Sequence, residues 1–359
     1  IDNKINDLKV YVIDKRCQGS VGPTPWYFGD GTFDNEKLIK KWALNKKRTQ
    51  PRGKQSPHEH SWGCFYTRTT GIWQTVWLEA VEQEHIRNIT IQPNVKSSSF
   101  VFLPEYASNI NGQLKVDISF KSKKISSKLL STKNKKFSIK INKPKIWSVG
   151  QPNLYDFTFT LIDKDNKTCD VVKSYGGMRS IEIKRNKIYL NGKPLYQRLV
   201  LDQGFYPKGI WTAPSDKDLK NDILLSMKAG FNGARLHEKV FEDRFHYWAD
   251  KLGYITWAEF PNWGLNENAK ASEVSFMQEW PRIVHYLKNH PSIITWTPFN
   301  ETNTLECNAQ HKSLMRKAYN ITKKIDPTRP VNETSGYQHQ KTDIWTVHHY
   351  EPIPELLKK

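Results

Sequence analysis

The sequence is poor in cysteine and methionine, with four of each among 359 residues. Cys17, Cys64, Cys169 and Cys307 are widely scattered, and none has the spacing of a metal-binding motif. No apolar run approaches the ~18 residues of a membrane-spanning helix. A glycine-rich phosphate loop and a nucleophilic serine motif are also missing. These absences argue against a disulfide scaffold, a zinc module and a membrane span.

Acidic residues are scarce, with 36 Asp and Glu against 55 Lys and Arg, which gives a net charge of +19. Between Lys115 and Lys145 there are eleven lysines and one acid. Apolar residues alternate with these lysines, which predicts half-buried strands whose lysines face water. Because no nucleic-acid-binding motif accompanies the charge, we expect no nucleic-acid partner.

The first residues, "IDNKINDLKVYVID", lack the charged-then-apolar pattern of a signal peptide and an initiator Met. We therefore expect that the natural N-terminus is missing, and the sequence predicts no compartment. No membrane partner is expected, and the sequence does not predict the oligomeric state.

Short alternating apolar runs fill the first ~180 residues and are separated by Gly, Pro and Asn turns. This spacing predicts all-β sandwiches. A boundary near residue 80 divides the region into a first sandwich over 1–80 and a second over 81–182. A hairpin follows at 185–196, with Asn191-Gly192 as its turn.

Beyond this hairpin, apolar runs alternate with helical patterns. Six strand candidates end in "LVLD", "GARLHE", "YITWAEF", "SIITWTPFN", "RPVNETS" and "DIWTVHHY". One intervening helix has a capping signature at Ser215 and Asp218 and a stop at Gly230. The alternation predicts a parallel (β/α)8 barrel over 183–359, truncated after about strand six.

Polar residues follow most of these predicted strands. In a (β/α)8 barrel the strand ends meet on one face, where functional groups gather. Each residue alone has a structural alternative: Arg235 and Glu259 can form an ion pair, and His237 or His348 can be a core histidine. The coincidence across strands favours a site. The residues are Asp202, Arg235, His237, Glu259, Asn300, Glu301, His348, His349 and Tyr350.

Two carboxylates among tryptophans suit sugar chemistry. Indole faces, including that of Trp296, stack on pyranose rings, while Asn and Arg hold hydroxyl groups. A carboxyl in an apolar pocket keeps its proton near neutral pH and serves as a general acid.

Seven sequence blocks together resemble glycoside hydrolase family 2, which includes β-galactosidases, β-glucuronidases and β-mannosidases. They are "PRGKQ" (51–55), "GIWQTVWLE" (71–79), "LVLDQGFYPKGIWTAPSD" (199–216), "GFNGARLHEK" (230–239), "YWADKLGYITWAEFP" (247–261), "HPSIITWTPFNE" (290–301) and "DPTRPV" (326–331). The match runs along most of the chain in the family's order.

The resemblance implies a partial galactose-binding-like jelly roll, an immunoglobulin-like sandwich and a catalytic TIM barrel. It further implies a retaining β-glycosidase for terminal β-linked sugars, with β-galactosidase-like activity favoured. In that family the Asn-Glu pair ending strand four makes Glu301 the acid/base and Asn300 the partner of the sugar's 2-hydroxyl. Positions matching glycone-binding residues are Arg235, His237, Glu259, His349 and Tyr350.

The chain also departs from the family pattern. The family's nucleophile is a Glu ending strand seven, whereas this chain stops at "ELLKK" soon after strand six. We therefore expect a fragment, with the nucleophile outside it. Glu306, Glu333 and Glu351 lack the family context for that role. Some family members use Mg²⁺ or Na⁺, but the sequence contains no recognisable set of ligands for either ion. The alternative is a non-catalytic carbohydrate-binding protein or an inactive remnant.

Overall fold

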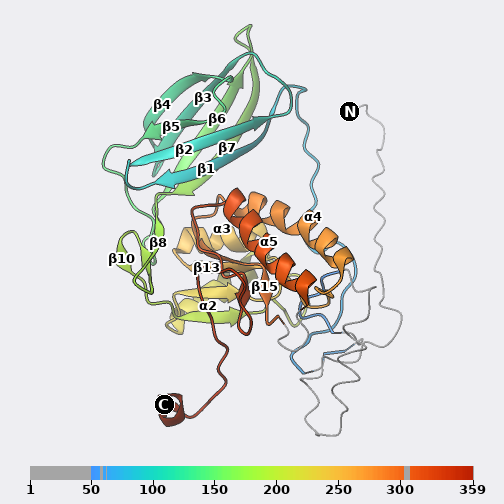
Figure 1. The fold of residues 1–359 in the computed structure, drawn as a ribbon. Helices are drawn as coiled ribbons and strands as arrows, with labels where there is room; N and C mark the ends of the chain where they lie inside the picture. Colours follow the sequence, from blue (N-terminus) through green and yellow to red (C-terminus); the bar gives the residue numbers. More distant parts are fainter. Residues whose placement is uncertain (1–49, 57–59, 62, 303–307, 359) are drawn as a thin grey trace.

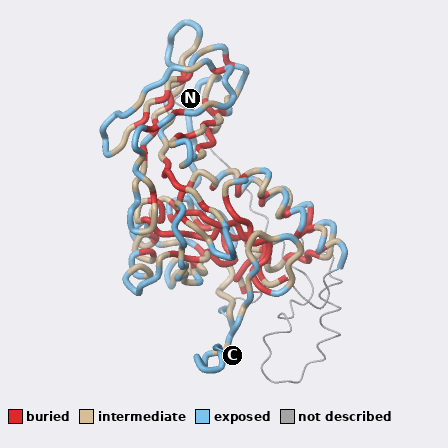
Figure 2. The backbone as a smooth tube through the Cα atoms, turned by 60° about the vertical axis from the view of Figure 1, so that its left-hand side comes forward, coloured by how far each residue is buried: buried red, intermediate tan, exposed pale blue. Residues whose placement is uncertain are grey.

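The computed structural model describes residues 50–56, 60–61, 63–302 and 308–358 (Figure 1). A β-sandwich lies beside an α/β domain, and Figure 2 shows a buried interior in each. The jelly roll predicted over 1–80 falls largely outside the described residues. Its described part is irregular, with an isolated bridge between Gln55 and Tyr66.

The sandwich consists of two antiparallel sheets. One contains β1 (Ile86–Asn94), β2 (Ser99–Tyr106) and β5 (Phe137–Lys140), and the other has the order β4 (Lys123–Ser131), β3 (Gln113–Phe120), β6 (Leu154–Ile162), β7 (Thr168–Gly177). The predicted alternation is confirmed on β3, where Leu114, Val116 and Ile118 are completely buried. Lysines of β4 such as Lys124 and Lys128 are exposed. The lysine-rich segment is therefore built into a folded sheet.

A small antiparallel sheet joins the sandwich to the barrel. It has the order β10 (Lys193–Pro194), β9 (Lys187–Leu190), β8 (Ile181–Lys184). The predicted turn is confirmed, because Asn191 and Gly192 both have positive φ, 55° and 78°, as a type I′ turn requires. Leu190 of this sheet packs with Ile255 and Ile294 in one buried cluster.

Parallel strands form the centre of the α/β domain in the order β11 (Leu199–Asp202), β12 (Gly233–Leu236), β13 (Ile255–Glu259), β14 (Ile293–Thr297). After Pro298 the chain continues as β15 (Phe299–Asn300), which pairs with β16 (Thr334–Ser335). Thr256 pairs with Ile293 but Trp257 with Thr295, so β14 has one extra residue at this step. Such a bulge changes which side later residues face.

Helices connect these strands as predicted. They are α2 (Asp216–Lys228), α3 (Asp243–Leu252), α4 (Lys270–Leu287) and α5 (Ala309–Ile325), with α6 (Pro354–Leu357) near the end of the chain. The cap of α2 is confirmed, since Ser215 Oγ accepts a hydrogen bond from the Asp218 backbone N–H. Phe276 and Trp280 of α4 pack against Phe299 and Leu314 in the buried layer between helices and strands.

The sixth predicted strand, 343–350, is not a strand in the structure. Side chains make most of its hydrogen bonds to the preceding segment: the Thr346 hydroxyl accepts from Gly336 N–H and Asn332 Nδ2, and Asp343 Oδ2 accepts from Val331 N–H. A regular backbone ladder is not formed here. Within the described ranges, no helix is long and apolar enough to cross a membrane.

The sandwich is hydrogen-bonded to the barrel through the turn after α4. Asn289 Oδ1 accepts from Ile91 N–H at 2.9 Å, and its Nδ2 donates to Ile89 O at 2.8 Å. The Arg179 guanidinium donates to the carbonyls of Pro291 and Ile293. The turn leading into β14 is thus fixed from the sandwich side.

Candidate active site

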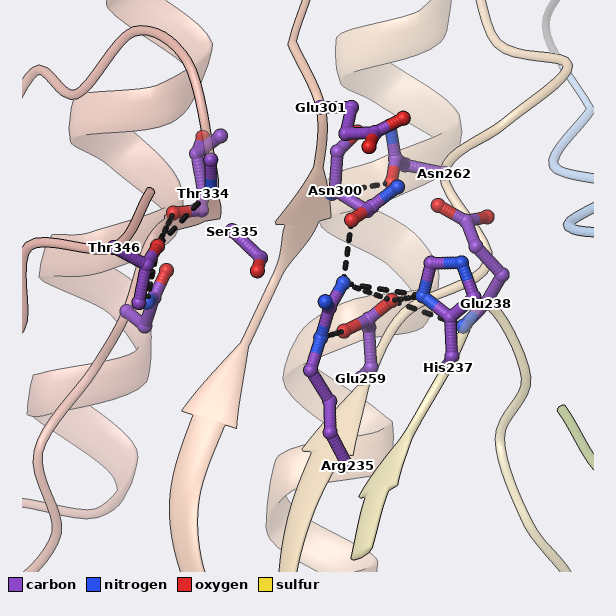
Figure 3. Close-up of polar contacts among 12 residues, drawn as sticks. Arg235, His237, Glu238, Glu259, Asn262, Asn300, Glu301, Thr334, Ser335 and Thr346 are labelled. Atoms are coloured by element: carbon purple, nitrogen blue, oxygen red, sulfur yellow. Dashed lines mark hydrogen bonds and ion pairs between the residues drawn. The ribbon is translucent and has the colours of Figure 1, made fainter. Parts of the chain in front are cut away.

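The predicted strand-end residues converge on one edge of the parallel sheet (Figure 3). Arg235 lies on β12, Glu259 ends β13 and Asn300 ends β15. Parallel pairing brings these ends to the same side. Figure 3 shows Arg235 between Glu259 and Asn300, with His237 beside them.

Arg235 is the centre of this cluster. Its Nε donates to Glu259 Oε2 at 2.7 Å, and its Nη2 donates to Glu259 Oε1 at 3.2 Å and to Asn300 Oδ1. Nη2 also lies 3.1 Å from His237 Nδ1. One guanidinium therefore fixes the orientation of three neighbouring side chains.

Glu259 is buried and holds several neighbouring residues. Its side chain is completely buried, and Oε1 lies 2.8 Å from His237 Nδ1 and accepts from Glu238 N–H at 2.9 Å. Burial raises the pKa of Glu259, but the Arg235 and His237 contacts outweigh it and lower the pKa to about 2. The structure shows the ion pair with Arg235, and sugar binding by Glu259 stays a prediction.

His237 is buried beside two charged groups. Burial lowers its pKa, although the Glu259 charge acts in the opposite direction. The imidazole is therefore neutral near pH 7.

Asn300 has both a fixed backbone and a free donor. Its N–H donates to Asn262 Oδ1 at 2.7 Å, and Asn262 Nδ2 donates to Glu267 Oε1 at 3.0 Å. The Asn300 Nδ2 atom is buried and has no hydrogen-bond partner among the described residues. Buried donors are rarely left unpaired, so this amide is suited to a ligand oxygen.

Glu301 projects from a strained backbone position. Its φ is +48°, which side-chain-bearing residues seldom adopt, and its N–H donates to Ser335 O at 2.9 Å. Carboxylate Oε1 lies 2.6 Å from His348 Nδ1 and accepts from the Tyr350 hydroxyl at 3.1 Å. Two hydrogen-bonding side chains, His348 and Tyr350, therefore meet at one oxygen of a half-buried carboxylate.

The protonation of Glu301 differs from the expectation of a proton-holding carboxyl. Burial raises its pKa, but the hydrogen bonds and charge of His348 and the Tyr350 hydroxyl outweigh burial and lower the pKa below its usual value. The surroundings are polar rather than apolar, which is the physical reason for the difference.

Three predicted residues lie apart from this cluster. Asp202 accepts from Gly204 N–H, and burial raises its pKa to about 6. His349 is exposed and contacts the Glu351 backbone. Trp296 is completely buried against Trp280, and its indole donates to Asp326 at 2.8 Å. It faces the helices because of the β14 bulge, so a sugar-stacking role is not retained.

Several residues of the site were not singled out as site residues from the sequence. His348 was named as a strand-end residue, but its neighbour His349 was preferred. Lys54 belongs to the "PRGKQ" block, which gave no chemical signal by itself. Glu238 and Asn262 follow the strand ends without any distinctive motif.

The other acids weighed as a second carboxylate have separate roles. Glu333 is completely buried and accepts from the backbone of Lys341 and, at short range, of Gln340. Glu351 accepts from Ile353 N–H, and Glu306 lies outside the described residues. No group of three metal-ligating side chains occurs in the part of the chain that the structure describes.

Two family models together match most of the chain. The model described as glycosyl hydrolases family 2 matches residues 84–179, and that family's TIM barrel domain matches residues 181–356. The chain belongs to glycosyl hydrolase family 2. The earlier resemblance is confirmed.

Curated relatives agree with this membership. A β-galactosidase of Pseudoalteromonas haloplanktis is 29% identical over 301 residues, covering 77% of this chain and 28% of the relative. A putative β-glucuronidase of Formosa agariphila is 29% identical over 279 residues, covering 72% of this chain and 33% of the relative. The chain therefore spans about a third or less of these relatives' length.

Solved structures share the fold. A β-D-glucuronidase of Dictyoglomus thermophilum has a TM-score of 0.61 at 22% identity, over 69% of this chain and 44% of that one. A Ruminococcus gnavus β-glucuronidase in complex with D-glucuronic acid has a TM-score of 0.63 at 17% identity, over 69% and 42%. A sandwich followed by a TIM barrel domain is the architecture common to this family.

Proposed function

We propose that this chain belongs to a retaining β-glycosidase that hydrolyses terminal β-linked sugars, with Glu301 as its acid/base. The observation that carries the proposal is that two adjacent residues at one strand end offer complementary groups: the Glu301 carboxylate, held by His348, and the Asn300 Nδ2 donor, which has no partner among the described residues. The amide donates to a sugar hydroxyl, while Glu301 protonates the leaving oxygen and then activates water.

The remaining residues position these two. Arg235 holds the Asn300 side chain by its Oδ1, which directs Nδ2 toward the ligand. His348 and Tyr350 both bind Oε1 of Glu301, so Oε2 is the oxygen left to meet a substrate. A retaining mechanism also needs a second carboxylate about 5 to 5.5 Å from the first. Among the described residues, Glu333 and Glu351 accept hydrogen bonds from backbone N–H groups, and we assign neither of them this role.

A β-galactosidase-like preference is the finer part of the proposal. The Pseudoalteromonas β-galactosidase supports it, whereas the Formosa relative supports a glucuronide. The alternative is a carbohydrate-binding protein without hydrolysis.

The test is hydrolysis of a panel of 4-nitrophenyl β-glycosides by the full-length protein and its Glu301→Ala variant. We expect a loss of activity of about 10²-fold or more in the variant and partial rescue by azide, a nucleophile that needs no general base. His349→Ala is the matched control, because His349 is exposed. If wild type binds sugars but cleaves none, the alternative replaces the enzyme.

A further inference from the structure

The segment 51–56, which precedes the sandwich, lies across the barrel's active face. The backbone N–H groups of Arg52 and Gly53 donate to Trp263 O at 2.8 and 3.0 Å. Gly53 has a φ of +58°, and a Cβ atom there would lie 2.1 Å from Glu238 O. Only glycine allows this approach. The segment is therefore closely fitted to the barrel, and the next residue is Lys54.

Lys54 is a buried cation with weak partners. It is 4% exposed, and its Nζ lies 3.6 Å from the Trp263 ring centroid and 3.6 Å from Cys64 Sγ. Within the described ranges, no carboxylate forms an ion pair with it. A thiol and an aromatic face compensate only part of the cost of burying an ammonium group.

The surrounding charges do not balance Lys54. The Arg235 charge is matched by Glu259. Burial, together with the Glu259 charge, raises the pKa of Glu238 well above its usual value and so disfavours the charged form of that carboxyl. Because burial lowers the pKa of His237, that ring is also neutral. In the corner formed by Lys54, Trp263 and Glu238, the ammonium group of Lys54 is buried against a ring and a thiol and has no ion-pair partner among the described residues.

This corner adjoins the cluster around Arg235, because the Trp263 ring lies 6.3 Å from the His237 ring and the Trp263 N–H donates to Glu238 Oε2 at 3.0 Å. Burial and the His348 contact have the largest effects on the pKa of Glu301, and the Lys54 charge also lowers it. An anion bound by Lys54 would thus be held within electrostatic range of Glu301.

We propose that Lys54 binds an anionic substituent of the sugar, either the carboxylate of a hexuronic acid or a sulfate ester. This inference rests on the proposed function, since Glu301 defines where the sugar lies. Binding would give the buried ammonium a charged partner, which the described residues do not supply. The net charge of +19 over the chain favours the approach of such substrates.

The test compares substrates that differ in one charged group. Full-length wild type, Lys54→Met and Lys54→Arg are assayed with the 4-nitrophenyl β-glucuronide and β-glucoside, the β-galacturonide and β-galactoside, and a 6-sulfated β-galactoside. We expect wild type to prefer one anionic member, and Lys54→Met to lower kcat/KM for that member by roughly 10- to 100-fold. In Lys54→Met, kcat/KM for the neutral member of the pair should change little. Lys54→Arg should keep much of the preference for the anionic member.

The preferred anionic member distinguishes a carboxylate from a sulfate. Preference for neutral sugars throughout, or an equal loss on both members of a pair, would overturn the proposal. Lys128→Met on exposed β4 is the control and leaves all rates unchanged.

If no glycoside is cleaved, the proposed function fails while the role of Lys54 is still decided by binding. Calorimetry with sodium D-glucuronate, D-glucose and 6-sulfated galactose then compares wild type with Lys54→Met. Anion binding that is lost in the variant supports the proposal, and no difference between the proteins overturns it.

Discussion

Nδ1 of His348 and Oε1 of Glu301 lie 2.6 Å apart although 47 positions separate the two residues in the sequence. His348 is held in turn by Ser335, whose Oγ lies 2.9 Å from Nε2. Ser335 also accepts the Glu301 N–H through its carbonyl. Glu301 is therefore fixed at its backbone and at its carboxylate by one connected group.

The His348 contact predicts a shift in pH dependence. Burial raises the pKa of Glu301 and His348 lowers it, so His348→Ala should let burial dominate and raise that pKa. A general acid with a higher pKa stays protonated to higher pH, so the basic limb of kcat/KM should move upward. His349→Ala, which removes no contact to Glu301, should leave the profile in place. Equal shifts in both variants would contradict this assignment.

Arg235→Met should destabilise the barrel strongly. The substitution leaves Glu259 buried without its main partner, which costs about 3–5 kcal/mol of unfolding free energy. Urea denaturation measures this loss. Arg244→Met, which breaks the half-exposed pair with Asp216, should cost at most about 1 kcal/mol. If Arg235→Met lost as little unfolding free energy as Arg244→Met, burial of the Glu259 charge would not depend on its pairing with Arg235.

The contribution of the Arg235–Glu259 pair to the free energy of unfolding should decrease as the pH is lowered. The pKa of Glu259 is about 2 in the folded protein, below the ~4.3 of an unfolded Glu. Its stabilisation is present above pH ~4.3 and is lost as the pH falls through about 2. In Arg235→Met the loss of stability below pH ~4.3 should be shallower than in wild type, as measured by urea midpoints across that range.

Trp296→Phe separates a core role from a sugar-binding role. The variant loses the indole hydrogen bond to Asp326 and part of the packing against Trp280. We expect a loss of about 1–3 kcal/mol in unfolding free energy and an unchanged KM. A raised KM with unchanged stability would instead place the indole in the sugar pocket.

Wild type should lose stability at high pH because buried Glu267 becomes charged, and Glu267→Gln should not show this loss. Burial raises the pKa of Glu267 to about 7, above the ~4.3 of an unfolded Glu. Its favourable contribution is complete below pH ~4.3 and is lost as the pH rises through 7. The glutamine variant keeps the Asn262 contact without a charge, so it should exceed wild type in urea midpoint at pH 8. At pH 5 the advantage should be small, and exposed Glu355→Gln should show none at either pH.

Local signals in the sequence predicted much of the fold. Asn191-Gly192 specifies its turn through the backbone freedom of both residues, and Ser215 caps α2 through a contact three residues away. The convergence of Arg235 and Asn300 followed from strand polarity alone. These features depend on near neighbours or on a rule that holds for every parallel sheet.

The residues that were misplaced depend on longer-range details. A one-residue bulge in β14 turns Trp296 toward the helices. Because both faces of a parallel strand are apolar, the sequence pattern does not reveal the bulge. Neighbouring residues in an extended segment face opposite sides, so choosing between His348 and His349 required the register. Lys54 reaches the site from another part of the chain through contacts that no periodicity encodes.

Asn289 gives the open edge of β1 a partner. Its side-chain amide donates and accepts as a neighbouring strand's peptide group would, at Ile89 O and Ile91 N–H. Unpaired strand edges are where folded proteins join into aggregates. The α/β domain therefore occupies part of this strand edge, and we expect a substitution at Asn289 to show itself first as loss of protein to aggregates.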